Sequence, residues 1–191
     1  MSIVTIVLAA GGSSRFGRPK QLLQFKGATL LRRAVDASVN SRSDHTVVVL
    51  GADADLMRSE LDRLEVSIVI NPRWIDGIAS SIRAGVNSLP ASVEGALLTL
   101  CDQPEVSTGH LDALIRRFLE RHESIVASGY GGTAGVPALF PRSLFSELLS
   151  LKGDRGAKQI IERYNTRTDV IPFPGGTIDI DTHDDLERID G

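Results

Sequence analysis

The chain has 191 residues, a hydrophobic content of 42% and a formal net charge of −3. This length suits one α/β domain with a large core, and the slightly acidic balance lacks the basic footprint of a nucleic-acid-binding protein. One cysteine excludes an internal disulfide, four scattered histidines disfavour zinc, and the apolar stretches are too short to cross a bilayer. We therefore expect a cytoplasmic protein without a secretory leader, whose partner is a small molecule rather than a nucleic acid or a membrane.

The first predicted strand leads into a glycine-rich, cationic loop. Residues 3–10 form an uncharged, β-branched segment, which is typical of a parallel strand buried on both faces. Small residues that let the backbone approach a ligand and three cations then occur together: Gly11, Gly12, Ser13, Ser14, Arg15, Arg18 and Lys20. Exposed N–H groups beside clustered cations suit an anion with several phosphates, and a solvated basic surface is the alternative.

Two better-known phosphate-binding loops do not fit this spacing. Gly12 and Gly17 are separated as in a Walker A loop, but Arg18 and Pro19 follow in place of Lys and Ser or Thr. A dinucleotide fingerprint, G-x-G-x-x-G, is interrupted by the Gly-Gly-Ser at 11–13. Because Pro19 disfavours a regular helix, we expect the cations on an extended loop that folds over the ligand.

Strands and helices alternate after this loop. The predicted elements are a helix capped by Thr29 with its apolar residues at 30–37, a strand at 45–50, a polar helix at 53–64, a strand at 66–70, a loop at 71–77, a helix at 78–89, a strand at 95–101, an amphipathic helix around 111–119 and a strand at 124–128. This alternation predicts a doubly wound, mostly parallel sheet.

The pattern changes in the last third of the chain. We expect a glycine-rich loop at 129–135, an apolar segment at 136–140, helices starting at Pro141 and at 153, late strands at 168–171 and 177–180 whose direction stays open, and a last helix capped by Thr182. No repeat or linker interrupts the chain, so residues 1–191 are interpreted as a single domain.

Acidic residues follow two of the predicted strands. Asp102 leaves the strand at 95–101, at the edge where ligands bind in open parallel sheets. A carboxylate facing a phosphate loop suits Mg²⁺, while a turn or cap aspartate is the alternative. Near the C-terminus, Asp181, at the end of a predicted strand just before the Thr182 cap, is the better second ligand, and Asp179 is the next. Asp184 and Asp185 are set aside because they fall in the first turn of the last predicted helix, where the macrodipole favours acids without any function. Such a set fits metal-assisted phosphoryl chemistry.

The sequence contains no convincing nucleophile system. The serines lack an obvious His-Asp relay, and no G-x-S-x-G elbow occurs. Cys101 ends a predicted strand and is interpreted as a buried, inert thiol. The site would therefore act by positioning and charge stabilisation, with the substrate supplying the attacking oxygen.

Five motifs in order resemble a known family. Residues 8–20 are similar to the signature L-A-[AG]-G-x-[SG]-x-R-[ML]-G-x-x-K of nucleotidyltransferases, and the segments at 80–85, 101–104, 153–157 and 179–182 are similar to S-S-[IL]-R-A-G, C-D-[QM]-P, G-D-x-G-A and D-I-D-T. The chain resembles the MobA-like nucleotidyltransferases, most of all the molybdenum cofactor cytidylyltransferases. The resemblance implies a three-layer, Rossmann-like α/β fold of the nucleotide-diphospho-sugar transferase type.

The implied reaction transfers CMP from CTP to the phosphate of molybdopterin-bound molybdenum and releases pyrophosphate. Ala10, in an Ala-Ala-Gly start, is what the resemblance links to CTP over GTP. Val136 stands where many members have histidine, which leaves the acceptor open. The alternatives are a sugar phosphate acceptor, a GTP-dependent molybdopterin reaction, and a cofactor chaperone that binds nucleotide without turnover. A molybdoenzyme or its maturation chaperone is a further implied partner.

The resemblance also implies roles for individual residues. Arg15 and Lys20 would neutralise the triphosphate and the developing charge, and Asp102 and Asp181 would hold Mg²⁺ or Mn²⁺. Arg15, Lys20 and Asp102 are the implied catalytic residues. The implied nucleotide-binding residues are Leu8, Ala9, Ala10, Gly11, Gly12, Ser13, Ser14, Arg15, Lys20, Asn71, Gly77 and Ser81. Ser81 is equally interpretable as an ordinary polar residue early in a helix.

Overall fold

The computed structural model describes residues 1–12 and 19–178. Several predictions fall outside these ranges and stay predictions: the positions of Ser13, Ser14, Arg15, Asp179 and Asp181, and the helix expected after Thr182.

A seven-stranded sheet organises the described residues, in the order β5-β4-β1-β6-β8-β7-β9. β8 runs antiparallel to both of its neighbours, and the other pairings are parallel. The strands are β1 Ser2–Ala9, β4 His45–Leu50, β5 Ser67–Ile70, β6 Val93–Leu100, β7 Ile125–Tyr130, β8 Thr133–Pro141 and β9 Thr168–Pro172, with a small separate pair of β2 Gln24–Phe25 and β3 Ala28–Thr29. The predicted mostly parallel α/β sheet is confirmed.

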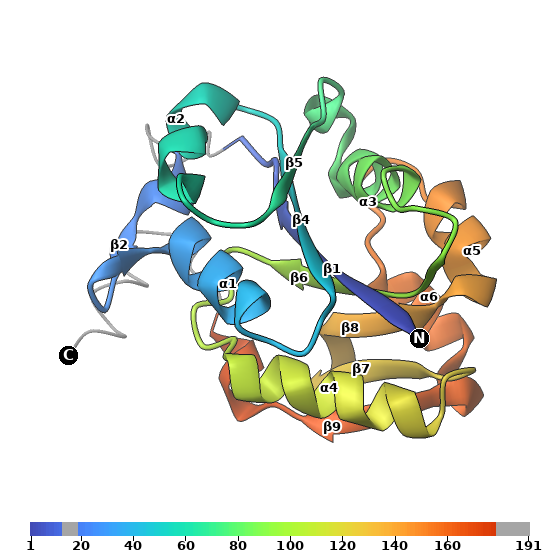
Figure 1. Ribbon diagram of the computed structural model, residues 1–191. Helices are drawn as coiled ribbons and strands as arrows, with labels where there is room; N and C mark the ends of the chain where they lie inside the picture. The colour runs from blue at the N-terminus through green and yellow to red at the C-terminus, as the bar shows by residue number, and fades with distance from the viewer. Residues whose placement is uncertain (13–18, 179–191) are drawn as a thin grey trace.

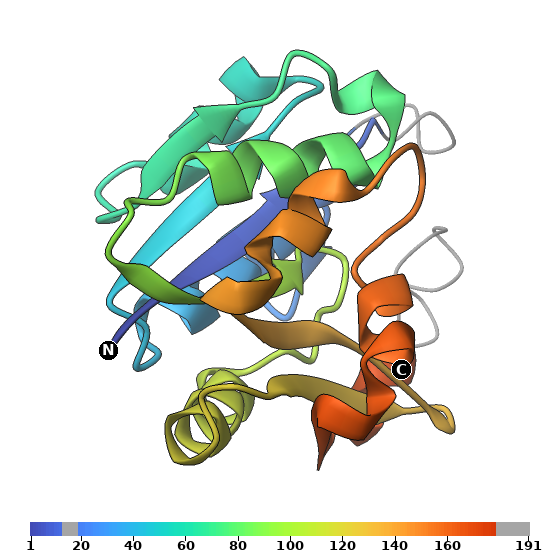
Figure 2. The ribbon, with the colours of Figure 1, turned by 90° about the vertical axis from the view of Figure 1, so that its right-hand side faces the viewer.

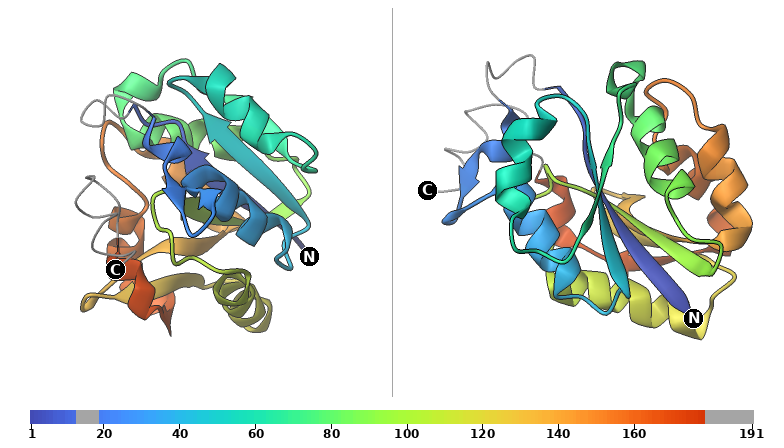
Figure 3. Two further views of the ribbon diagram at one scale, coloured as in Figure 1. Left: turned by 90° about the vertical axis from the view of Figure 1, so that its left-hand side faces the viewer. Right: turned by 45° about the horizontal axis from the view of Figure 1, so that its top comes forward.

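Helices cover both faces of this sheet and give three layers (Figures 1 and 3). On one face lie α1 Leu30–Val39, α2 Ala54–Arg58 and α4 Thr108–Glu120; on the other lie α3 Ile78–Asn87, α5 Phe145–Ser150 and α6 Lys158–Arg163. Short 3₁₀ turns are η1 Lys20–Leu22, η2 Ser59–Leu61, η3 Trp74–Asp76, η4 Arg142–Leu144, η5 Asn165–Arg167 and η6 Pro174–Thr177. No helix among the described residues is long and apolar enough to cross a membrane.

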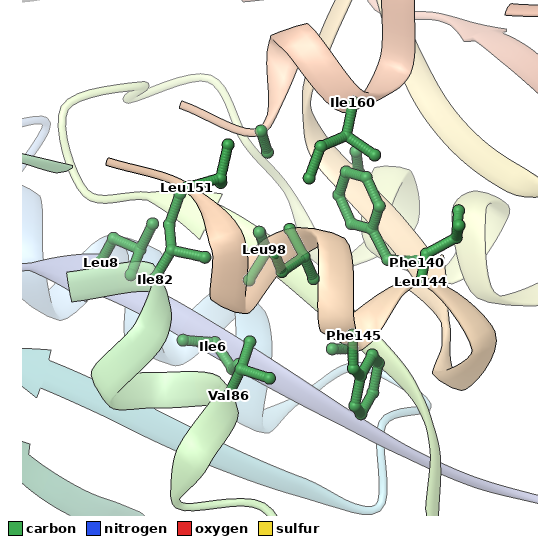
Figure 4. Close-up of a cluster of buried hydrophobic side chains, with 14 of the residues drawn as sticks. Ile6, Leu8, Ile82, Val86, Leu98, Phe140, Leu144, Phe145, Leu151 and Ile160 are labelled. Carbon is green, nitrogen blue, oxygen red and sulfur yellow. The ribbon is translucent and has the colours of Figure 1, made fainter. Parts of the chain in front are cut away.

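Both faces of β1 are buried, as its uncharged sequence predicts. Val4, Ile6 and Leu8 join the core beneath α3, α5 and α6, and Val7 and Ala9 join the core beneath α1. Figure 4 shows the first of these cores, where the labelled side chains converge between sheet and helices: Ile6, Leu8, Ile82, Val86, Leu98, Phe140, Leu144, Phe145, Leu151 and Ile160. Each fully buried side chain of this size stabilises the fold by about 1.5–3 kcal/mol, which fixes the strands that carry the site.

Several predicted boundaries are wrong. The helix expected at 53–64 is only α2 followed by η2, and of these elements only Met57 and Leu61 are buried, so few apolar contacts support a longer helix. The expected loop at 129–135 is instead the tip of the β7–β8 hairpin, closed by Gly131 and Gly132 with φ of 56° and 74°, as a two-residue hairpin turn requires.

The C-terminal half contains further corrections. Pro141 ends β8 and precedes a 3₁₀ turn, η4, that leads into α5, so helical structure begins at Arg142 as expected but the α-helix begins at Phe145. The helix expected from 153 begins at Lys158. β9 is parallel to β7. Thr177, expected to open a strand, ends η6, whose Gly176 packs where a Cβ would collide with the rings of Tyr130 and Phe173.

Candidate active site

A cleft of about 330 Å³ opens at the carboxyl ends of β1 and β6. From β1 the chain proceeds to β4 and β5 on one side of the sheet and then to β6 on the other, so the strand order reverses here, which is where open α/β sheets bind ligands. The lining residues are Leu8, Ala9, Gly11, Gly12, Lys20, Gln21, Trp74, Ile75, Gly77, Ile78, Ser81, Leu100, Cys101, Asp102 and Asp154. A volume of this size is typical of a small-molecule site.

Lys20 and Asp102 meet in this cleft. The Lys20 Nζ donates to Asp102 Oδ2 across 2.6 Å, and the two side chains are 20% and 22% exposed. The pair places a cation and a carboxylate together where β1 and β6 end, with Leu8 paired to Leu100 in the register just before. A charge-assisted bond at this distance is strong, and both groups remain within reach of a ligand.

Gln21, which the sequence analysis did not single out, fixes the position of Lys20. Its side chain is 1% exposed, and its Nε2 donates to the carbonyl oxygens of Ala9 at 3.1 Å and Gly11 at 2.7 Å. These bonds hold η1 against the end of β1. The glycine loop and the lysine are thus tied together by one buried amide, a contact that local sequence pattern does not reveal.

The second oxygen of Asp102 bears on metal binding. Asp102 Oδ1 is buried and has no hydrogen-bond partner among the described residues. Those residues contain no group of three acids, histidines or cysteines that would hold a metal alone. Mg²⁺ usually takes one or two protein carboxylates and completes its shell with phosphate oxygens and water. Asp102 therefore fits an ion held jointly with a phosphorylated substrate.

Cys101 lies next to this carboxylate and is 4% exposed. Burial, with a smaller contribution from the negative charge of Asp102, raises the pKa of its thiol far above the usual range. The thiol stays protonated at neutral pH, which agrees with its interpretation as inert.

Trp74, another residue missed by the sequence analysis, packs over the glycine loop. A Cβ on Gly12 would lie 2.6 and 2.8 Å from two ring carbons of Trp74, and a Cβ on Gly51 would lie 2.6 Å from both the Ala10 carbonyl oxygen and the Trp74 Cβ. The absence of side chains at both glycines therefore lets the indole lie against the loop. Trp74 also lines the cleft.

Ala10 and Asn71, predicted to bind nucleotide, do not line this cleft. Ala10 is buried against Gly51, and Asn71 is 4% exposed with its amide nitrogen donating to the hydroxyls of Ser80 at 2.8 Å and Ser81 at 3.0 Å. Through these two hydrogen bonds the Asn71 side chain holds the loop at 71–77 against α3. Ser81 both accepts this bond and lines the cleft.

Gly77 is required by a close approach. It adopts φ of 91°, and a Cβ there would collide with the carbonyl of Gly153 and the carboxylate of Asp154. The turn between α5 and α6 is thereby seated on the start of α3 and completes the cleft wall.

The sequence of the chain matches a known protein family. The chain matches the MobA-like NTP transferase domain over residues 5–168, most of its length. The chain belongs to the MobA-like NTP transferase family. Its sequence relatives include the purine catabolism protein PucB of Bacillus subtilis, 28% identical over 84% of this chain and 80% of that protein. The nicotine blue oxidoreductase of Paenarthrobacter nicotinovorans is 28% identical over 98% and 96%. The molybdenum cofactor cytidylyltransferase of Escherichia coli is 23% identical over 97% and 94%.

A solved structure is similar over nearly the whole chain. The crystal structure of Rv0371c from Mycobacterium tuberculosis superposes with a TM-score of 0.86 at 30% identity, covering 98% of this chain and 97% of that one. A second crystal structure of Rv0371c is a complex with manganese, with a TM-score of 0.83 at 27% identity, covering 99% and 98%. Each of these relatives spans most of its own length in the comparison, so this MobA-like NTP transferase is matched as a whole fold.

On the other side of Asp102, this NTP transferase carries a buried polar link. Gln103 Nε2 donates to the Val136 carbonyl at 3.2 Å, and the Tyr130 hydroxyl donates to the same oxygen at 2.9 Å. The β7–β8 hairpin is thus tied to the segment that carries Asp102. A Cβ on Gly175 would lie 2.7 Å from Glu105 Cβ, so the chain just before residue 178 also passes this segment.

Proposed function

We propose that this protein transfers CMP from CTP to the phosphate of a molybdopterin-type acceptor. The pairing of Lys20 with Asp102 carries the proposal, because it puts a phosphate-binding cation and a metal-binding carboxylate in one cleft beside a glycine loop. Family membership supports nucleotidyl transfer, and the single cysteine suits a cytoplasmic enzyme.

In the proposed reaction an oxygen of the acceptor phosphate attacks the α-phosphorus of CTP. The new P–O bond forms as the bond to the bridging α,β-oxygen breaks, and pyrophosphate leaves with that electron pair. Lys20, moving from Asp102 to the triphosphate, would neutralise the charge that develops on the leaving group, together with Arg15. The backbone N–H groups of Gly11 and Gly12 would contact phosphate oxygens, since no side chain shields them.

Asp102 would hold the divalent ion, Mg²⁺ or Mn²⁺, with Asp181 as second ligand. A bound ion would supply charge neutralisation on the phosphates. The unpartnered Oδ1 of Asp102 supports this assignment. The chain at Gly175 lies against the side chain of Glu105, three residues from Asp102, which supports Asp181 as the candidate second ligand.

Support for CTP and for the acceptor comes from sequence. The chain shares the Ala-Ala-Gly start that the resemblance links to CTP, and it is similar to the E. coli cytidylyltransferase over nearly its full length. Ala10 is buried against Gly51, so we propose that it influences base choice by setting the path of the glycine loop rather than by touching the base. We place the acceptor near the β7–β8 hairpin, because the Val136 carbonyl accepts a hydrogen bond from Gln103, the residue after Asp102.

Pyrophosphate release from each of the four NTPs, with and without molybdopterin, tests this proposal. We expect release with CTP only when the acceptor is present, and much less with GTP. Pyrophosphate release from GTP and molybdopterin would indicate guanylyl transfer instead of cytidylyl transfer. Release that requires a sugar phosphate instead of molybdopterin would indicate a sugar phosphate acceptor. Binding of CTP without release under any condition would favour a cofactor chaperone.

A further inference from the structure

Asp154 lines the cleft, yet none of the roles above uses it. It comes from the turn between α5 and α6, which passes beside the start of α3 (Figure 2), whereas Lys20 precedes α1 on the other face of the sheet. The cleft thus has the Lys20–Asp102 pair where β1 and β6 end and a second carboxylate, Asp154, beside the start of α3.

Backbone contacts hold Asp154 in place. The Gly153 carbonyl accepts a hydrogen bond from the Ala79 N–H at 3.1 Å, and Gly153 itself adopts φ of 61°. The missing side chain of Gly77 leaves the space that the Asp154 carboxylate occupies. A turn tied to the first residues of α3 presents this carboxylate at a fixed place in the wall.

The Asp154 carboxylate has unused acceptor capacity. It is exposed, and it makes no hydrogen bond or ion pair within residues 1–12 and 19–178. An ionised carboxylate is an acceptor only, so it attracts hydrogen-bond donors, and without a cation between them it repels phosphates. Asp154 lies against Gly77, and the lining residues on either side of Gly77, Ile75 and Ile78, are apolar, with Ile75 79% exposed. This wall therefore suits an uncharged, partly apolar group that carries hydrogen-bond donors.

We propose that Asp154 accepts hydrogen bonds from the nucleoside part of the substrate and so determines the direction in which the nucleotide lies. The donors are the sugar hydroxyls or the amino group of the base, and the triphosphate then extends toward Lys20 and the glycine loop. The inference rests on the proposed function, because it needs a nucleotide in this cleft. It adds a specificity-determining residue from the Gly-Asp-x-Gly-Ala segment.

Nucleotide binding measured in the presence of Mg²⁺ tests this role. Trp74 is the only tryptophan in the chain and lines the cleft, so its fluorescence reports occupancy without turnover. CTP is compared with 2′-deoxy-CTP, which lacks a sugar donor, and with UTP, which lacks the amino group. We expect wild type to prefer CTP over at least one analogue by about tenfold, as for hydrogen bonds to a charged group.

In Asp154→Ala that preference is expected to fall to near one, and the analogue concerned identifies the donor. Lys152→Ala, on the same turn but outside the cleft lining, is the control and should keep the wild-type preference. If the alanine variant fails to fold, Asp154→Asn, of equal size and without charge, replaces it. An unchanged preference in a folded Asp154 variant, or equal binding of all three nucleotides by wild type, would overturn the inference. Absence of any NTP binding to wild type would instead overturn the proposed function.

Discussion

The ammonium of Lys20 and the carboxylate of Asp102 lie 2.6 Å apart although 82 positions separate them in the chain. β1 and β6 are adjacent in the sheet, and each supplies one side of this contact through the segment that follows it. In the proposed reaction both groups have other partners, the triphosphate for Lys20 and a metal ion for Asp102. The proposed reaction therefore requires that substrate binding separate the Lys20–Asp102 ion pair.

The first prediction concerns Lys20. Replacing it with alanine removes the cation expected to stabilise the leaving pyrophosphate, so pyrophosphate release should fall about 100-fold or more while thermal unfolding changes little. Lys158→Ala on α6, whose side chain is 55% exposed and pairs only weakly with Glu162 at 4.0 Å, is the matched control and should keep wild-type activity. Wild-type turnover in Lys20→Ala would refute the assignment. Arg15→Ala is predicted from sequence to behave like Lys20→Ala.

A second prediction concerns metal affinity without nucleotide. The Lys20 ammonium occupies Asp102 Oδ2, so it competes with any divalent ion for that carboxylate. Lys20→Gln should increase the affinity for Mn²⁺ about tenfold, measured by electron paramagnetic resonance of free Mn²⁺. Asp102→Asn should abolish the Mn²⁺ binding. Equal Mn²⁺ affinity in wild type and Lys20→Gln would mean that the ion pair does not oppose metal binding.

The third prediction tests the contact between Gly12 and Trp74. A methyl group at position 12 would overlap the indole, so Gly12→Ala should displace the loop and weaken CTP binding. Adding Trp74→Ala removes the obstacle, and the double variant should lose about 1 kcal/mol less than the sum of the two single losses. Equilibrium dialysis measures the CTP affinity of wild type, the two single variants and the double variant. Strict additivity would show that the indole does not restrict the loop.

The fourth prediction concerns pH and His110. Burial lowers the pKa of His110 to about 4, and its Nε2 lies 2.7 Å from the Ser128 hydroxyl. The unfolded histidine, with a pKa of about 6.5, binds a proton first as pH falls, so the free energy of unfolding should decrease between about pH 6.5 and pH 4. In His110→Gln this decrease should be smaller, measured by urea unfolding. Identical slopes in wild type and His110→Gln would contradict the prediction.

The local sequence pattern predicted those elements whose buried faces are recognisable from the spacing of their own apolar residues. The strand at His45–Leu50 and the helix capped by Thr29 were predicted at their observed positions, because continuous β-branched and periodic apolar residues face the core directly. The β7–β8 hairpin was missed because glycines at 131 and 132 are compatible with both a loop and a tight turn, and only pairing across the hairpin decides between them.

The candidate site divides in the same way. Lys20, Asp102, Gly11 and Gly12 were predicted to lie together because charge and glycine content are visible along the chain, and they line one cleft. Gln21 and Trp74 were missed because their roles arise from contacts: one amide bonds two carbonyls, and one indole covers a loop more than sixty positions away. Asn71 stays a predicted nucleotide-binding residue, and its amide nitrogen donates to Ser80 and Ser81 at the start of α3, a contact that sequence does not show.

The most direct test of the account follows the position of phosphorus in CTP. The protein is incubated with molybdopterin-type acceptor and CTP labelled either at the α- or at the γ-phosphorus, and the products are separated. We predict that the α label enters the acceptor as CMP, that the γ label leaves as pyrophosphate, and that Asp102→Asn abolishes both. Appearance of the γ label in the acceptor, or release of the α label only as free CMP, would contradict nucleotidyl transfer by this site.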